Sequence, residues 1–94
     1  MKVIEYEVGV GSSTAYGEVH VSDAATDDEI CLAIANRLYS IDYSKTIRDG
    51  RMEIEYTVDV GGGCGTGTVL VSENASEDKI LLAIMNDLYH VYYH

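Results

Sequence analysis

The fold is decided by residues 4–44, which read IEYEVGVGSSTAYGEVHVSDAATDDEICLAIANRLYSIDYS and are followed by a second version of themselves. Residues 54–94 read IEYTVDVGGGCGTGTVLVSENASEDKILLAIMNDLYHVYYH, and the two segments align without a gap at an offset of fifty residues. Nearly half of the aligned positions are identical. An internal repeat indicates that one structural unit is used twice.

Each copy opens with two segments in which apolar and polar residues alternate. In the first copy the alternation covers residues 4–10 and again residues 15–21, with a short polar loop between them. A period of two predicts half-buried strands, and the short loop predicts that they form a hairpin. The outward side chains of this first hairpin are predicted to be Glu5, Glu7, Tyr16, Glu18 and His20.

A helix is predicted after each hairpin. Thr26 followed by Glu29 fits a capping box, and the acids that come between them suit the positive end of a helix dipole. We expect helices over residues 27–39 and 77–89, the second capped by Ser76. Their wide apolar arcs predict that each helix contacts both a sheet and the other helix.

Each helix is followed by a segment that reads as a further strand. Alternation over residues 41–47 predicts a third strand, and residues 91–94 predict a short last one. Asp49-Gly50 is a turn signal, which predicts a hairpin into the second copy. Four tyrosines at equivalent positions are expected to be half buried: Tyr6, Tyr39, Tyr56 and Tyr89.

The expected architecture is an α+β fold made of a duplicated ββα(β) unit with pseudo-twofold symmetry. If each strand after a helix pairs with the first strand of the other copy, one antiparallel sheet of up to six strands forms; otherwise a four-stranded sheet remains. Both helices would cover one face and leave the other in water. A copy of about 40 residues is too short to bury a sufficient core alone. Residues 1–94 are therefore predicted to be one domain in which the repeats share one core.

The charge balance limits the classes of partner. Sixteen acidic residues against six Lys and Arg give a net charge of −10. Binding to nucleic acid through phosphates needs a basic surface, so the expected partner is a basic protein. No apolar run is long enough to span a membrane, and the N-terminus does not read as a signal peptide. Two cysteines at non-equivalent positions predict a reducing, cytoplasmic compartment.

No motif points to catalysis, a cofactor or a metal. The loop of residues 61–67 is rich in glycine but lacks the Lys-Ser/Thr of a P-loop, so it reads as a flexible hairpin tip and a candidate contact loop. Cys31 reads as core packing and Cys64 as an exposed thiol. His90 and His94 share one side of an extended chain, but two ligands do not make a zinc site. We therefore expect a protein that is not an enzyme and has no cofactor.

The distribution of acids suggests a binding surface. Acids gather on the open face of the predicted sheet and at the two helix starts, and outward tyrosines stand among them. Alternate residues of a strand lie about 6.8 Å apart and neighbouring strands about 4.8 Å, a scale comparable to phosphates along a nucleic acid. Outward tyrosines beside acids are common in protein-binding surfaces. The candidate partner-binding residues are Glu5, Glu7, Tyr16, Glu18, Asp27, Asp28, Glu55, Asp59, Glu77, Asp78 and Tyr92.

A hairpin, a segment such as VSDAATDDEICLAI or VSENASEDKILLAI and an amphipathic helix, in a small acidic chain, resemble the small acidic proteins of phages and mobile elements. Among those, anti-CRISPR and anti-restriction proteins disable host nucleases by occupying their nucleic-acid sites. The resemblance implies a non-catalytic inhibitor acting in the host cytoplasm, and it transfers no individual functional residue. The alternatives are an assembly module that forms homo-oligomers through tyrosines and a sheet edge, and a small-ligand or metal binder at His90 and His94.

Overall fold

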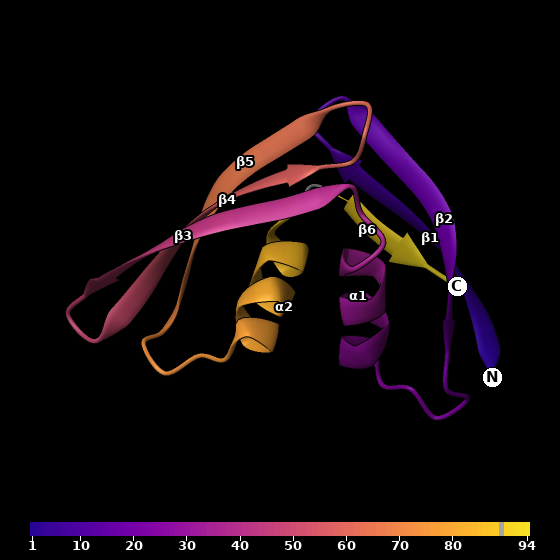
Figure 1. Ribbon diagram of the computed structural model, residues 1–94, viewed down its shortest axis with the longest axis horizontal. Helices are drawn as coiled ribbons and strands as arrows, with labels where there is room; N and C mark the ends of the chain where they lie inside the picture. The colour runs from indigo at the N-terminus through magenta and orange to yellow at the C-terminus, as the bar shows by residue number, and fades with distance from the viewer. Residues whose placement is uncertain (89) are drawn as a thin grey trace.

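The computed structural model describes residues 1–88 and 90–94. Within them the chain is an α+β structure with two helices and two three-stranded antiparallel sheets (Figure 1). The two sheets approach each other along one side of the molecule and diverge from there. Both helices lie between the diverging sheets, so each sheet has an inner face toward the helices and an outer face toward solvent.

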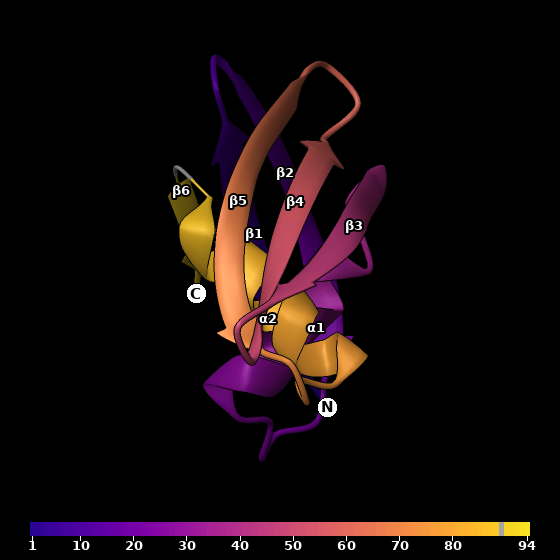
Figure 2. The same cartoon turned by 90° about the vertical axis from the view of Figure 1, so that its left-hand side faces the viewer.

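Each sheet contains a hairpin and a third strand that, in the sequence, comes directly after the helix of the other half of the chain. The first sheet has the order β2 (Ser13–Val21), β1 (Lys2–Val10), β6 (His90–Tyr93). The second sheet, seen from its outer side in Figure 2, has the order β3 (Ser40–Arg48), β4 (Arg51–Asp59), β5 (Cys64–Ser72). The expected pairings, β6 with β1 and β3 with β4, are both present.

The expectation of one continuous sheet of four to six strands is wrong, because the two sheets meet through hairpin tips and not through strand edges. Ser13 Oγ, at the start of β2, donates a hydrogen bond to the Gly62 carbonyl in the loop before β5, at 3.1 Å. Among the described residues no strand ladder joins the sheets. The glycine-rich loop is therefore a contact between the two hairpins of the same chain.

The helices begin where the caps predict and end earlier. Helix α1 (Asp27–Ala35) is capped by Thr26 Oγ1, which accepts from the Glu29 amide at 3.2 Å, and α2 (Glu77–Asp87) is capped by Ser76. The amides of the next two residues after α1's C-cap bond three residues back, which tightens the last turn and ends the helix. As a result Tyr39 is 77% exposed, and the expectation that it is half buried is wrong. Tyr89 lies outside the described residues.

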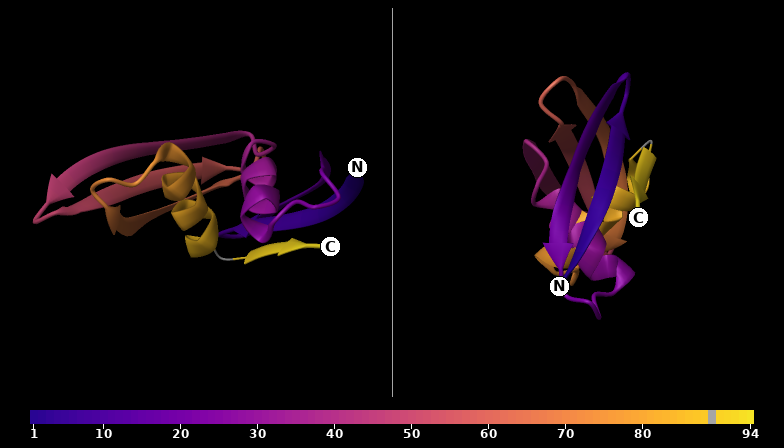
Figure 3. Two further views of the ribbon diagram at one scale, coloured as in Figure 1. Left: turned by 90° about the horizontal axis from the view of Figure 1, so that it is seen from below. Right: turned by 90° about the vertical axis from the view of Figure 1, so that its right-hand side faces the viewer.

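The core lies between the inner faces of the sheets and the helices. Helix α1 packs on β2, α2 packs on β5, and the two helices pack on each other, which confirms the prediction from their wide apolar arcs (Figure 3). Val8, Ile34, Ile54, Val58 and Ile84 are fully buried in one cluster drawn from both halves of the chain. No helix in the described part of the chain has the length and apolarity to cross a membrane.

Each sheet has a buried tyrosine that crosses over a glycine on the neighbouring strand. Tyr6 is paired with Gly17, and Tyr56 is paired with Gly67. A Cβ atom on Gly17 would lie 2.6 Å from the Tyr6 hydroxyl, and one on Gly67 would lie 2.5 Å from the Tyr56 hydroxyl. Both glycines are therefore needed for the space that the rings occupy.

Candidate protein-binding face

The outer face of the first sheet brings together five predicted site residues. The strand register places Glu7 between Tyr16 on β2 and Tyr92 on β6 in one row. The next row consists of Glu18, Glu5 and His94, since Glu5 and His94 exchange two backbone hydrogen bonds of 2.9 Å. We name this surface the Glu–Tyr face: Glu5, Glu7, Tyr16, Glu18 and Tyr92, with the histidines His20, His90 and His94.

Each glutamate of the Glu–Tyr face has a histidine beside it. His90 Nε2 lies 2.6 Å from Glu7 Oε2, His94 Nε2 lies 3.4 Å from Glu5 Oε2, and His20 Nε2 lies 3.7 Å from Glu18 Oε1. The Glu7–His90 pair is the most sheltered, with side chains 37% and 28% exposed. Each of the three histidine rings thus lies within 3.7 Å of a glutamate carboxylate on this face.

Two pKa values on this face depart from their ordinary range. The pKa of Glu7 is lowered, chiefly by the hydrogen bond to His90, against a smaller opposing effect of burial, with a further lowering contribution from Tyr16. The pKa of Tyr16 is raised, chiefly by its hydrogen bond with Glu7. Glu7 is thus held as a carboxylate and Tyr16 as a neutral phenol.

The Glu–Tyr face surrounds an open depression. The depression measures about 650 Å³ and is lined by Glu5, Glu7, Glu18 and His94, by the two outward tyrosines and by Tyr6 and Gly17. Tyr16 is 73% exposed and Tyr92 is 64% exposed, so both rings stand out from the sheet. Within the described strands of this sheet, no lysine or arginine occupies an outward position. The face is therefore acidic and aromatic at once.

Two further predicted residues, Glu55 and Asp59, lie on the outer face of the second sheet. The other side chains of this face are polar and mostly small. We name this surface the Thr face: Asp42, Ser44, Glu55, Thr57, Thr66 and Thr68, around a depression of about 580 Å³. Asp59 lies at the end of β4, and its Oδ1 accepts from the Gly61 amide at 2.7 Å. Arg48 and Arg51 form a cross-strand pair at the opposite end of the sheet. The structure thus divides the predicted acidic array between two separate faces.

The remaining predicted residues, Asp27, Asp28, Glu77 and Asp78, lie in the first turns of the helices. Asp27 Oδ1 accepts from the Tyr93 hydroxyl at 2.8 Å, and this hydrogen bond is the main cause that raises the pKa of Tyr93 to about 12. Glu77 also helps, after burial, to raise the pKa of Tyr43. Of these four acids, Asp27 thus joins a helix start to a sheet, and all four lie outside the Glu–Tyr face.

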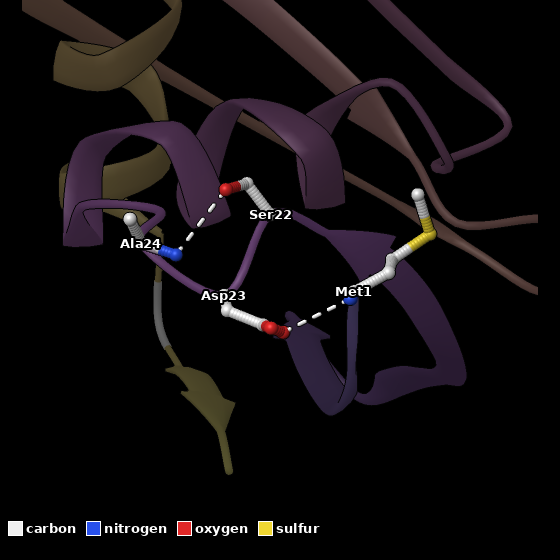
Figure 4. A network of polar contacts seen from close by, with 4 residues as sticks. All are labelled: Met1, Ser22, Asp23 and Ala24. Carbon is white, nitrogen blue, oxygen red and sulfur yellow. Dashed lines mark hydrogen bonds and ion pairs between the residues drawn. The ribbon is translucent and has the colours of Figure 1, made fainter.

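The loop before α1 is also tied into the structure. The N-terminal amine of Met1 lies 3.1 Å from Asp23 Oδ1, and the Ala24 amide donates to Ser22 Oγ at 3.2 Å (Figure 4). Asp23, one of the acids near the first helix start, is therefore engaged by a cation of its own chain.

The cysteines and the potential metal ligands are the candidates for a second site in the described part of the chain. Cys31 and Cys64 are free thiols; Cys31 is half buried on α1, and burial is the main cause that raises its pKa. Across residues 1–88 and 90–94 no group of three or more His, Cys, Asp or Glu side chains is placed to hold a metal ion.

Sequence reasoning missed the grouping of the three histidines with the glutamates, because it placed His90 and His94 on one side of an extended chain without placing them beside Glu5 and Glu7. The signal was their even spacing with Tyr92, but it becomes informative only once β6 is known to pair with β1.

No protein-family model, no curated protein and no solved structure matches this chain.

Proposed function

We propose that the protein is a non-catalytic binding protein that uses the Glu–Tyr face to occupy the basic nucleic-acid site of a host enzyme, in the manner of anti-CRISPR and anti-restriction proteins. The observation that carries the proposal is the combination on one sheet face of three glutamates, two exposed tyrosines and no outward lysine or arginine in the described strands. Such a face is complementary to a basic groove and has aromatic anchors for affinity.

Mimicry of nucleic-acid phosphates is supported by the carboxylate spacing. Glu5 and Glu7 are alternate residues of β1, about 6.8 Å apart along the strand, and Glu18 is opposite Glu5 on β2. A rigid sheet holds these charges in place, which steers a basic partner and makes association dependent on salt. We place this activity in the cytoplasm of a host cell, as expected for a phage-encoded inhibitor.

We also propose that the halves are copies of one ββαβ unit related by a twofold axis. The reciprocal pairings of β6 with β1 and of β3 with β4 support it. So do two tyrosines that approach helix starts in corresponding positions, Tyr93 toward Asp27 and Tyr43 toward Glu77.

The test is affinity purification of partners on the immobilised full chain, followed by mass spectrometry. The triple variant Glu5→Lys, Glu7→Lys, Glu18→Lys is compared with a control on the second sheet, Glu53→Lys, Glu55→Lys, Asp59→Lys, which changes net charge equally. We expect the native chain and the control to capture a nucleic-acid-handling enzyme and block its nucleic-acid binding, and the first variant to lose it. Capture that ignores salt, or equal loss in both variants, would contradict the proposal.

A second candidate is a homo-oligomer assembled through an edge strand and the outward tyrosines. Exposed apolar side chains on the outer faces, among them Leu70 and Tyr92, favour it. Sedimentation of the full chain distinguishes the two candidates: a stable oligomer that Tyr16→Ser and Tyr92→Ser dissociate would favour assembly over inhibition.

A further inference from the structure

We propose that the Glu–Tyr face binds an arginine side chain of the partner protein, held between the rings of Tyr16 and Tyr92 with its guanidinium over the three glutamates. This inference rests on the proposed function for the existence of a basic partner, and it adds which cationic side chain the face selects and where that side chain lies.

The row of Tyr16, Glu7 and Tyr92 sets the width of the site. Because β2 and β6 are the two neighbours of β1, their outward side chains are separated by two strand spacings, about 10 Å. That width leaves room for one slender side chain between the rings and is too narrow for a helix, whose diameter with side chains is about 10–12 Å. The depression of about 650 Å³ lies at this place.

The glutamates supply acceptors below the rings. Glu7 lies between the tyrosines, and Glu5 and Glu18 form the neighbouring row. His90 Nε2 lies 2.6 Å from Glu7 Oε2, and Glu7, which is also hydrogen-bonded to Tyr16, lines the depression. Glu5 and Glu18 are more open, with side chains 67% and 57% exposed. A cation in the depression would meet carboxylates from two directions.

This combination suits arginine better than lysine. A guanidinium is planar, stacks on aromatic rings and donates paired hydrogen bonds to carboxylates. A lysine ammonium is compact and strongly hydrated, so it gains less from the two rings. Two exposed tyrosines beside three carboxylates provide both the stacking surfaces and the acceptors.

The charges disfavour other occupants. A second copy docked face to face would bring three glutamates against three, and like charges in contact are costly. A phosphate-bearing ligand would be repelled for the same reason.

The test uses the full chain and two probes, the capped tripeptide acetyl-Gly-Arg-Gly-amide and its lysine counterpart, titrated while amide chemical shifts are followed by NMR. We expect the arginine peptide to shift residues of β1, β2 and β6 around the depression and to bind about two- to fivefold more tightly than the lysine peptide. Tyr16→Leu and Tyr92→Leu should each reduce this preference. Tyr39→Leu, which removes an exposed tyrosine elsewhere, is the matched control and should leave it unchanged.

Equal binding of the two peptides, shifts spread over the helix starts, or the same loss in the Tyr39→Leu control would overturn the arginine site. This test is independent of the proposed function. If the arginine preference holds but no nucleic-acid enzyme is captured from the host, the proposed function fails and the arginine site stands. If capture depends on the glutamates but the peptides bind equally, the proposed function stands and the arginine site fails.

Discussion

The outer faces of the two sheets occupy equivalent positions of the repeat and carry different chemistry. On the Glu–Tyr face the central row is Tyr16, Glu7 and Tyr92, whereas the row with the same repeat positions on the Thr face is Thr66, Thr57 and Asp42. Thr68 lies at the repeat position equivalent to Glu18. Of the three glutamates, only Glu5 has a glutamate at the equivalent position, Glu55. The inner faces, by contrast, keep the same apolar pattern.

This difference indicates which outward side chains the fold requires and which it does not. Outward strand positions have few tertiary contacts, and substitutions there change stability little. The second sheet forms with threonine or aspartate at the positions equivalent to Glu7, Glu18, Tyr16 and Tyr92. These four side chains are therefore not required by the fold, which is why we propose a binding role for them.

The strongest way to sharpen the comparison is to convert one face into the other. A chain with Asp42→Tyr, Thr57→Glu, Thr66→Tyr and Thr68→Glu would carry the tyrosine–glutamate rows on both sheets. We expect it to bind two equivalents of the arginine tripeptide where the native chain binds one, because each sheet would then have a depression of the same chemistry. NMR titration gives the stoichiometry and locates the second site.

The converse chain, with Glu7→Thr, Tyr16→Thr, Glu18→Thr and Tyr92→Asp, is the control and should bind no arginine peptide. If the converted second sheet gains no site although the chain stays folded, then the rows are not sufficient and the histidines of the first sheet are also needed.

The next prediction compares the inner faces of the two sheets through substitutions of Gly17 and Gly67. Gly17→Ala and Gly67→Ala each place a methyl group against a tyrosine ring, and such overpacking costs about 1–3 kcal/mol. We expect Gly67→Ala to be the more destabilising, because the hydroxyl of Tyr56 is hydrogen-bonded to Asp87 on α2 and its ring has less freedom to move. Urea unfolding measures both. Gly62→Ala, which meets nothing within 4 Å, is the control and should be nearly neutral.

A smaller effect is expected from the tyrosine hydroxyls themselves. Tyr56→Phe removes the hydrogen bond to Asp87 and should cost about 1 kcal/mol at neutral pH. Tyr6→Phe should be nearly neutral, because the Tyr6 hydroxyl makes no hydrogen bond to a side chain or backbone group among the described residues. A loss of equal size in both variants, measured by urea unfolding, would show that the two sheets do not differ in this respect.

The Tyr56 contribution should also depend on pH. Burial, followed by the hydrogen bond to Asp87, raises the pKa of Tyr56 from 10.0 to about 12. A raised pKa means that the stabilisation is fully present below pH 10 and is lost as the pH rises toward 12. The stability difference between the native chain and Tyr56→Phe should therefore shrink over that interval.

The smallest expected effect is the acid sensitivity that Glu7 gives to the first sheet. The pKa of Glu7 is lowered from 4.5 chiefly by His90, so its contribution is present above pH 4.5 and lost as the pH falls below it. The stability difference between the native chain and Glu7→Gln should shrink on acidification. NMR should show the Glu7 carboxyl carbon titrating at lower pH in the native chain than in a His90→Ala variant, because His90 supplies the main lowering contribution. The same titration in both chains would contradict this.

The sequence predicted the parts of the fold that local pattern determines. Alternation identified the buried side of β1 and β4, Thr26 and Ser76 marked the helix starts, and Asp49-Gly50 marked a turn whose φ angles are 49° and 78°. The outward direction of Glu5, Glu7, Tyr16 and Glu18 followed from the same alternation. These features depend on residues that are close together in the sequence, so the local sequence pattern is enough to predict them.

The division into two sheets and the grouping of histidines with glutamates were not predictable in this way. Alternation tells which side chains share a face, but it does not tell whether two hairpins join by an edge or by their tips. Glu55 and Asp59 were for this reason assigned to the same surface as Glu5. Likewise, the contact of His90 with Glu7 depends on pairing between strands at opposite ends of the chain.

That pairing has a consequence for the order of folding. The hairpins β1–β2, β3–β4 and β4–β5 are local and are expected to form early, whereas the ladder between β6 and β1 joins Tyr6 to Tyr93 and closes a loop of almost the whole chain. Contacts of such long sequence separation form late, after the cost in chain entropy has been met by earlier structure. Tyr92 and His90 are therefore expected to join the Glu–Tyr face in the last step of folding, so that the complete face exists only in the fully folded chain.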